Sequence, residues 1–161
     1  MLHVEKLRNL TLVIAAHPGV KNLGLTKLWK LIYFADVGAL REHGSTITGS
    51  EFVKYPHGPV PSRGEKILKE MKGEALIATA QRENAGYVQT SVSALAKPDT
   101  SVFSAEERAI IERVCVEFGR KTAKALSDLS HDEPAWALAN DLDKLDPELM
   151  HYGGAEDPEG L

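Results

Sequence analysis

The chain has 161 residues, 43% of them hydrophobic and 26% charged, which is typical of one folded soluble domain and unlike a disordered chain. Its 19 Lys and Arg residues and 23 Asp and Glu residues give a net charge of −4. This balance argues against a protein that mainly binds the phosphate backbone of nucleic acids, because such proteins usually carry an excess of basic residues. The one cysteine, Cys115, has no partner for an internal disulfide and lies among apolar residues, so we expect it in the core.

The N-terminal apolar run, residues 10–16, is too short to span a bilayer, and its apolar residues recur at helical spacing. It also lacks the charge pattern and cleavage site of a signal peptide. We therefore expect a cytoplasmic protein with no membrane partner.

Apolar spacing and turn residues predict most of the secondary structure in chain order. An extended segment is expected at about residues 49–55, and two strands of a β-hairpin at 75–80 and 87–95. The predicted helices are about 2–16, 25–43, 61–72, 104–119, a short one over 123–129, and a last one that begins at 130 and includes 136–139.

Several residues mark the ends of these elements. Gly44 is the expected C-cap of the second helix. Ser104–Glu107 and Ser130–Glu133 both have the spacing of a capping box, in which a serine hydroxyl and a glutamate carboxylate each bind the other residue's backbone amide. Gly64, inside a predicted helix, indicates a close contact between that helix and a neighbour.

These elements predict a predominantly helical α+β domain, with about six helices around the central helix 25–43 and a small antiparallel hairpin at one side. We expect this single domain to cover residues 1–140. Residues 141–161 carry seven acids and one lysine among prolines and glycines. They are predicted to be an acidic C-terminal extension, of which about the last ten residues are flexible.

The helix 25–43 holds the first candidate site. Asp36 falls in the middle of its apolar face, where an unpaired carboxylate would be costly, so we expect it to cap or pair with a neighbouring element, for example the corner at 55–61. Lys27, Lys30 and Arg41 fall on the opposite face with Phe34. An exposed aromatic residue among cations is typical of a partner-binding surface.

The second candidate is the segment Tyr55-Pro56-His57-Gly58-Pro59-Val60-Pro61. Three prolines and a glycine fix a rigid corner, which turns the chain from a strand into a helix. The same rigidity would present Tyr55, His57 and Pro59 to a partner at a low entropic cost.

The third candidate is the segment 128–133, where His131 lies beside acids. This pattern is compatible with acid–base or metal chemistry, but the capping box already accounts for Ser130 and Glu133. The sequence also lacks a His-x-x-x-His pair, a Cys-x-x-Cys pair and a phosphate-binding glycine loop. We therefore predict no metal, no cofactor and no catalytic residues, and we expect Trp29 and Trp136 to be core residues.

These three places, in this order, resemble the Panacea domain of the SocA-like antitoxins, a family with phage-associated members. Residues 25–36 resemble the family's "KLLYFAD"-like helix, with Trp29 and Asp36 as motif residues. Tyr55–Pro61 resembles its tyrosine and Gly-Pro-Val corner, with Gly58 at the centre. Ser130, His131 and Trp136 are similar to its closing "S-H…W" helix, and the likeness covers about residues 7–140.

The resemblance implies an antitoxin of a toxin–antitoxin system that binds its toxin directly and is not an enzyme. It further implies a possible AAA+ protease partner, since at least one member is similar to an adaptor that delivers its toxin for degradation. We hypothesise that Lys27, Lys30 and Phe34, together with Tyr55, His57 and Pro59, form the toxin-binding surface.

Two other functions fit parts of the sequence. A helix at 61–72 followed by a hairpin has the order of a winged helix-turn-helix, in which Arg63, Lys66, Lys69 and Lys72 would meet DNA phosphates. The second alternative is a small hydrolase that uses His131 and nearby acids, which is the least favoured.

Overall fold

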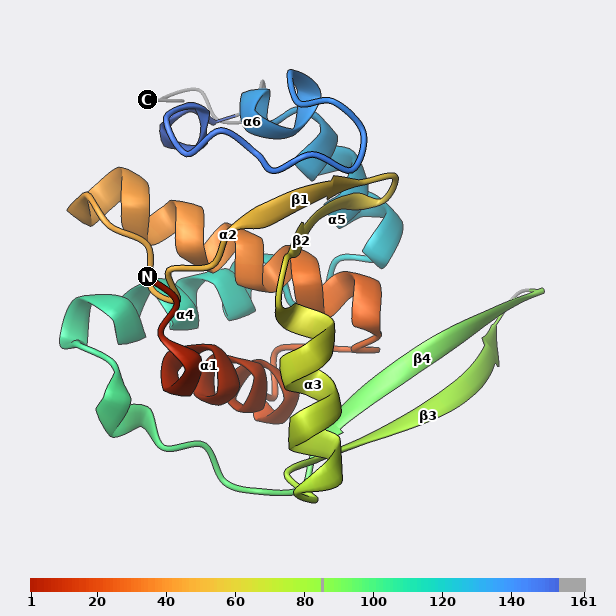
Figure 1. Cartoon of the computed structure of the whole chain (residues 1–161). Coiled ribbons are helices and arrows are strands. Elements are labelled where there is room, and N and C mark those ends of the chain that lie inside the picture. Colours follow the sequence, from red (N-terminus) through yellow and green to blue (C-terminus); the bar gives the residue numbers. More distant parts are fainter. Residues whose placement is uncertain (85, 154–161) are drawn as a thin grey trace.

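A computed structural model describes residues 1–84 and 86–153 of the chain. Within these residues it contains six α-helices, two short 3₁₀ helices and two antiparallel hairpins, which confirms the predicted α+β, mostly helical class (Figure 1). The helices are α1 (Val4–Ala16), α2 (Leu25–His43), α3 (Gly64–Gly73), α4 (Ala105–Phe118), α5 (Ala123–His131) and α6 (Pro134–Ala137). The 3₁₀ helices are η1 (Thr100–Val102) and η2 (Leu149–His151). The strands are β1 (Phe52–Tyr55), β2 (Gly58–Pro61), β3 (Ile77–Asn84) and β4 (Tyr87–Ala94).

Helix α2 lies at the centre of the molecule. Helices α1, α4 and α5, strands β2 and β4, and η2 all pack against it (Figure 1). Its buried residues therefore occur on all sides, and Leu28, Leu31 and Ile32 are fully enclosed. The helix ends at Gly44, whose φ of +86° is the left-handed conformation expected of a C-cap glycine.

One close contact and two buried residues predicted from the sequence are confirmed. Gly64 lies against the ring of Trp29, and a Cβ at this position would come within 2.8 Å of the indole. Trp29 itself is buried, as expected. Cys115 is also buried, and this burial raises the pKa of its thiol to about 12.

The predicted Pro- and Gly-rich corner contains the turn and the second strand of a hairpin. Strands β1 and β2 pair with Phe52 opposite Pro61 and Tyr55 opposite Gly58. The prolines concealed this strand from the sequence analysis, because proline is rare in the middle of a sheet. They are tolerated here because β2 is paired on one side alone and packs against helices with the other.

One of the two predicted capping boxes is wrong. Ser104 and Glu107 form the reciprocal pair that opens α4. Ser130, however, lies inside α5, where its hydroxyl donates to the Ser127 carbonyl at 2.7 Å. Helix α6 begins instead after Glu133, with Pro134 in its first turn, so the serine continues one helix and does not start the next.

Asp36 caps a neighbouring loop, as predicted, but the loop is 47–48 and not the 55–61 corner. Its Oδ1 accepts the amides of Ile47 and Thr48, both at 2.9 Å, and its Oδ2 accepts the Thr48 hydroxyl at 2.5 Å. All three residues are fully buried. Burial raises the pKa of Asp36 from 3.8 to about 6, and the hydrogen bonds from Thr48 and Ile47 oppose this rise.

No helix among the described residues is long and apolar enough to cross a membrane. The segment predicted to be flexible falls largely on residues 154–161, which lie outside the described part of the chain.

The environment of Asp36 makes the stability of the protein depend on pH. The folded-state pKa is above the unfolded value, so the contribution of Asp36 is fully present below pH 3.8 and is lost as the pH rises through about 6. In the variant Asp36→Asn, the side-chain carbonyl would accept the same two amides and would not titrate. We expect the free energy of unfolding of the wild type, relative to this variant, to fall by about 3 kcal/mol over this range.

Urea unfolding of both proteins between pH 3.5 and 8 measures this difference. Two curves that stay parallel across the range would show that the pKa of Asp36 is the same in the folded and unfolded states.

Candidate functional site

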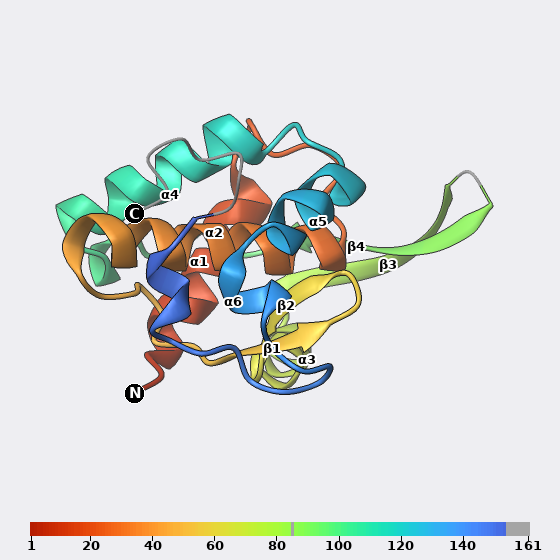
Figure 2. The same ribbon diagram turned by 90° about the horizontal axis from the view of Figure 1, so that it is seen from above.

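Three distant segments of the chain meet on one side of α2. Strand β2 packs against both α2 and α5, α2 and α5 also pack on each other, and α6 follows α5 directly, so the β1–β2 hairpin lies beside all of them (Figures 1 and 2). These are the three segments that the sequence analysis selected. The structure brings them into one place.

Gly58 is the closest point of this contact. Its φ of +121° is unfavourable for other residues, and a Cβ built on it would lie 2.4 Å from Lys30 Cε and 2.4 Å from Ser130 Oγ. Only glycine therefore lets the hairpin approach α2 and α5 this closely. This is a physical reason for a glycine between the tyrosine and the proline of the corner.

Lys30 holds the next residue of the hairpin. Its side chain is completely buried, and its Nζ donates to the Pro59 carbonyl at 2.8 Å. The cost of burying the ammonium lowers the pKa of Lys30 to about 7. Deprotonation does not remove the contact, because a neutral amine can still donate to a carbonyl.

Three residues that the sequence analysis expected to be exposed are buried. Lys27 and Lys30 are 2% and 0% exposed, and Pro59 is buried beneath Lys30. Lys27 Nζ donates to the carbonyls of Lys21 and Gly119. The sequence analysis assigns the lysines to an exposed face because they are charged, but long aliphatic stems can be buried when the ammonium reaches backbone carbonyls.

Phe34 is half-buried and does not form an exposed aromatic surface. Its ring stacks on Phe118, with centroids 5.1 Å apart, and meets Tyr33 edge to face at 5.7 Å. It therefore joins α2 to the end of α4.

The exposed part of the site is built on Trp136 and His131. The two rings stack with centroids 4.0 Å apart and an interplanar angle of 15°. His131 Nε2 donates to the Pro56 carbonyl at 3.0 Å, and Trp136 Nε1 donates to the Tyr55 carbonyl at 3.0 Å. Trp136 is thus half-buried at the surface and holds the hairpin end, whereas the sequence analysis expected it in the core.

Lys54 and the C-terminal segment complete this region. Lys54 Nζ lies 4.1 Å from the centroid of the Trp136 ring and donates to the Ala139 carbonyl at 3.1 Å. The backbone of Leu142 donates to Lys54, and Lys54 donates to Asp143, both at 2.9 Å. Residues 142–145 therefore run along the outer edge of β1, and Leu145 enters the core.

A partly buried ion pair on α2 adds contacts to the C-terminal segment. Arg41 and Glu133 approach to 2.6 Å, and Arg41 also donates to the carbonyls of Met150 and Tyr152. The hydroxyl of Tyr33 is buried nearby, and its pKa is raised by burial and by the negative charge of Glu133.

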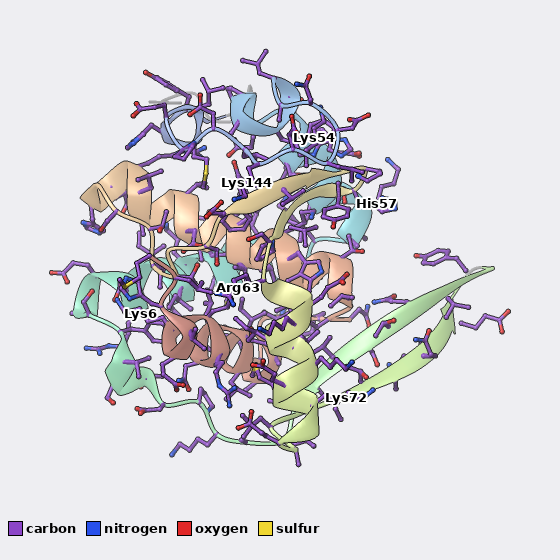
Figure 3. The ribbon with its side chains drawn as sticks, viewed as in Figure 1. Lys6, Lys54, His57, Arg63, Lys72 and Lys144 are labelled. Atoms are coloured by element: carbon purple, nitrogen blue, oxygen red, sulfur yellow. The ribbon has the colours of Figure 1, made fainter. Side chains whose placement is uncertain are left out.

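These contacts leave a small apolar and aromatic surface, which we call the hairpin surface. Tyr55, Leu138 and Leu142 are 43%, 71% and 66% exposed, although large apolar side chains are usually covered. His57 is exposed at the hairpin end, where Figure 3 shows it close to Lys54. The hairpin surface comprises Tyr55, His57, Trp136, Leu138 and Leu142.

The sequence analysis had found Tyr55 and His57 but missed Leu138 and Leu142. The available signal was two leucines four residues apart, one on each side of the expected domain end at residue 140.

The polar groups of the site are used in structural contacts. The imidazole of His131 and the hydroxyl of Ser130 both donate to backbone carbonyls, so neither is arranged beside a base or a nucleophile. Across residues 1–84 and 86–153, no three His, Cys, Asp or Glu side chains are grouped so as to hold a metal ion.

The architecture is thus that of a helical domain with a hairpin end that is fixed by contacts with three other segments. The family model for the antitoxin SocA-like Panacea domain matches residues 28–137, more than half of the chain. The chain belongs to this family. Neither the comparison with curated proteins nor the comparison with solved structures gives a match.

Gly58→Ala tests whether the hairpin depends on this close approach. The added methyl group would meet Lys30 and Ser130 and would also strain the backbone, so we expect a loss of about 3 kcal/mol in the free energy of unfolding. Gly44→Ala is the matched control, because Gly44 also has positive φ but no atom within 4 Å of its added Cβ. For the control we expect a loss of about 1 kcal/mol in the free energy of unfolding.

Urea unfolding measures both losses. Equal losses would mean that the hairpin shifts to accommodate the methyl group, and that the packing around Gly58 is not tight.

Proposed function

We propose that this protein is the antitoxin of a toxin–antitoxin system and that it neutralises its toxin by direct binding through the hairpin surface. Membership of the SocA-like Panacea family supports the role. The observation that carries the site assignment is the fixed hairpin end, in which Tyr55 is exposed and its carbonyl accepts a hydrogen bond from the Trp136 ring that stacks on His131.

The composition of the hairpin surface suits a protein partner. Tyrosine and tryptophan are enriched where binding energy is concentrated in protein interfaces, because they bury a large area with few rotatable bonds. The hydrogen bonds from Trp136 and His131 to the hairpin hold these groups in place before a partner arrives. A preformed surface loses less entropy on binding.

We propose that the protein acts without catalysis. The lysine, serine and histidine of the site support the hairpin through carbonyl contacts, and their replacement is expected to affect binding and stability together.

The same proposal can also include an AAA+ protease that completes the neutralisation. In that case the bound toxin would be degraded, so the complex would be short-lived in cells with the protease and stable in cells without it.

The DNA-binding alternative is less favoured. A helix-turn-helix needs a helix joined by a short turn to the recognition helix, but the element directly before α3 is strand β2. The cations on α3 are also interspersed with Glu65 and Glu70, and Figure 3 shows Arg63 and Lys72 near its opposite ends.

Co-expression with the product of the adjacent gene tests the proposal. We expect the wild type to restore growth and to co-purify with that product. Tyr55→Ala and His57→Ala should each weaken the complex by at least tenfold in Kd, because they remove exposed contact groups, and should leave the melting temperature nearly unchanged.

Val116→Ala is the matched control, since Val116 is an apolar residue on α4 that is 59% exposed. It should bind like the wild type. Growth without a stable complex would favour delivery to a protease, and an unaltered Kd for both hairpin variants would refute the site assignment.

A further inference from the structure

The β3–β4 hairpin projects from the body as an arm. Each strand has eight residues, and the arm comprises Ile77–Asn84 and Tyr87–Ala94 (Figures 1 and 2). Its base is fixed, because Ile77 and Val92 are buried in the core. Beyond the base, residues 80–83 and 86–88 are exposed.

The outer half of the arm adds little to the core. Tyr87 and Val88 are 60% and 66% exposed, although they are among the most apolar residues of the arm. A two-stranded ribbon is at best marginally stable alone in water, and a third strand or a packing surface is what usually stabilises it. The outer half thus has the form of an incomplete sheet.

The two edges of the arm differ. On the β4 side, Val92 N donates to the Leu23 carbonyl at 3.0 Å, and Gly24 forms a bridge with Ser91. The segment before α2 therefore covers that edge near the base. Within the described residues, no strand pairs with the outer edge of β3.

The register shows which backbone groups face this open edge. Val92 lies opposite Thr79, but its backbone amide donates to Leu23, on the side away from β3. Val92 and Thr79 therefore do not exchange backbone hydrogen bonds. Because the pattern alternates along an antiparallel ladder, the amides and carbonyls of Thr79, Gln81 and Glu83 point outward. Those of Arg82 point to β4.

The open edge also lacks the usual protection against strand addition. Exposed edges are commonly blunted by lysine, proline or inward-pointing charges. The two strands contain no lysine and no proline, and their charged residues are Arg82 and Glu83, which cancel.

We propose that the outer edge of β3, centred on Gln81–Glu83, binds an extended segment of the toxin as a third strand. A row of outward backbone donors and acceptors with alternating side chains matches an extended chain, and the neutral edge favours a segment of low charge. The arm and the β1–β2 end leave the body on the same side (Figures 1 and 2), so one partner can contact both. This inference rests on the proposed function.

Gln81→Pro is the test, with Gln81→Ala as its matched control. Both variants remove the Gln81 side chain and its 3.1 Å hydrogen bond to Thr90 Oγ1, but only proline removes the outward amide. We expect Gln81→Pro to raise the Kd for the adjacent-gene product at least tenfold and Gln81→Ala to change it less than threefold. Thr90→Pro, which removes an outward amide from β4, should also change the Kd less than threefold.

Amide hydrogen exchange provides a second measurement that does not depend on a variant. In the wild-type complex, the amides of Gln81 and Glu83 should become protected, whereas that of Arg82 should be protected already in the free protein.

Each contrary result has a distinct meaning. If Gln81→Pro binds like Gln81→Ala, or if the outward amides stay unprotected, the strand-addition proposal is wrong. If Thr90→Pro binds the adjacent-gene product as weakly as Gln81→Pro does, the assignment of the binding edge to β3 is wrong. If the chain alone forms a dimer that Gln81→Pro converts into a monomer, the occupant is a second copy. If the wild type binds nothing, the proposed function fails as well.

Discussion

The hydrogen bond from the buried Lys30 ammonium to the Pro59 carbonyl is the interaction on which the proposed binding region depends. It lies where the central helix, the β1–β2 hairpin and α5 converge, and the absence of a side chain at Gly58 makes it possible. This contact holds the buried side of the hairpin against α2. The His131–Trp136 stack and the C-terminal segment then hold the hairpin from its outer side.

Apart from Trp136, which belongs to both sets, the supporting residues differ from the exposed residues of the hairpin surface. The residues that fix the hairpin are buried or bound to backbone carbonyls, whereas Tyr55, His57, Leu138 and Leu142 are exposed and make few of the supporting contacts. Leu138 and Leu142 also lie beyond residues 28–137, the range of the family match. Part of the candidate surface is thus contributed by a segment outside the matched domain.

The sequence was informative for most elements that follow a local rule, although the capping-box rule failed at Ser130–Glu133. Helical spacing located α2, serine and glutamate three residues apart located the start of α4, and turn residues located the β3–β4 hairpin. It failed where tertiary packing decides. The stems of Lys27 and Lys30 are buried because α2 is covered on all sides, and periodicity does not show how many neighbours a helix has.

The candidate site was predictable in part for the same reason. The family resemblance selected the three segments that meet, and Tyr55 and His57 are exposed as expected. The pairing of Gly58–Pro61 with β1, and the passage of residues 142–145 along the other edge, join segments up to about ninety residues apart. Such contacts leave no periodic signal in the sequence.

The burial of Cys115 has a practical consequence for spectroscopy. It is the only thiol of the 161 residues, it is fully enclosed, and its pKa of about 12 leaves almost no thiolate at neutral pH. A cysteine introduced on the arm or beside the hairpin end would therefore react selectively with a maleimide dye or a nitroxide spin label. Distances between labelled sites can then be followed in the native background, without first removing a cysteine.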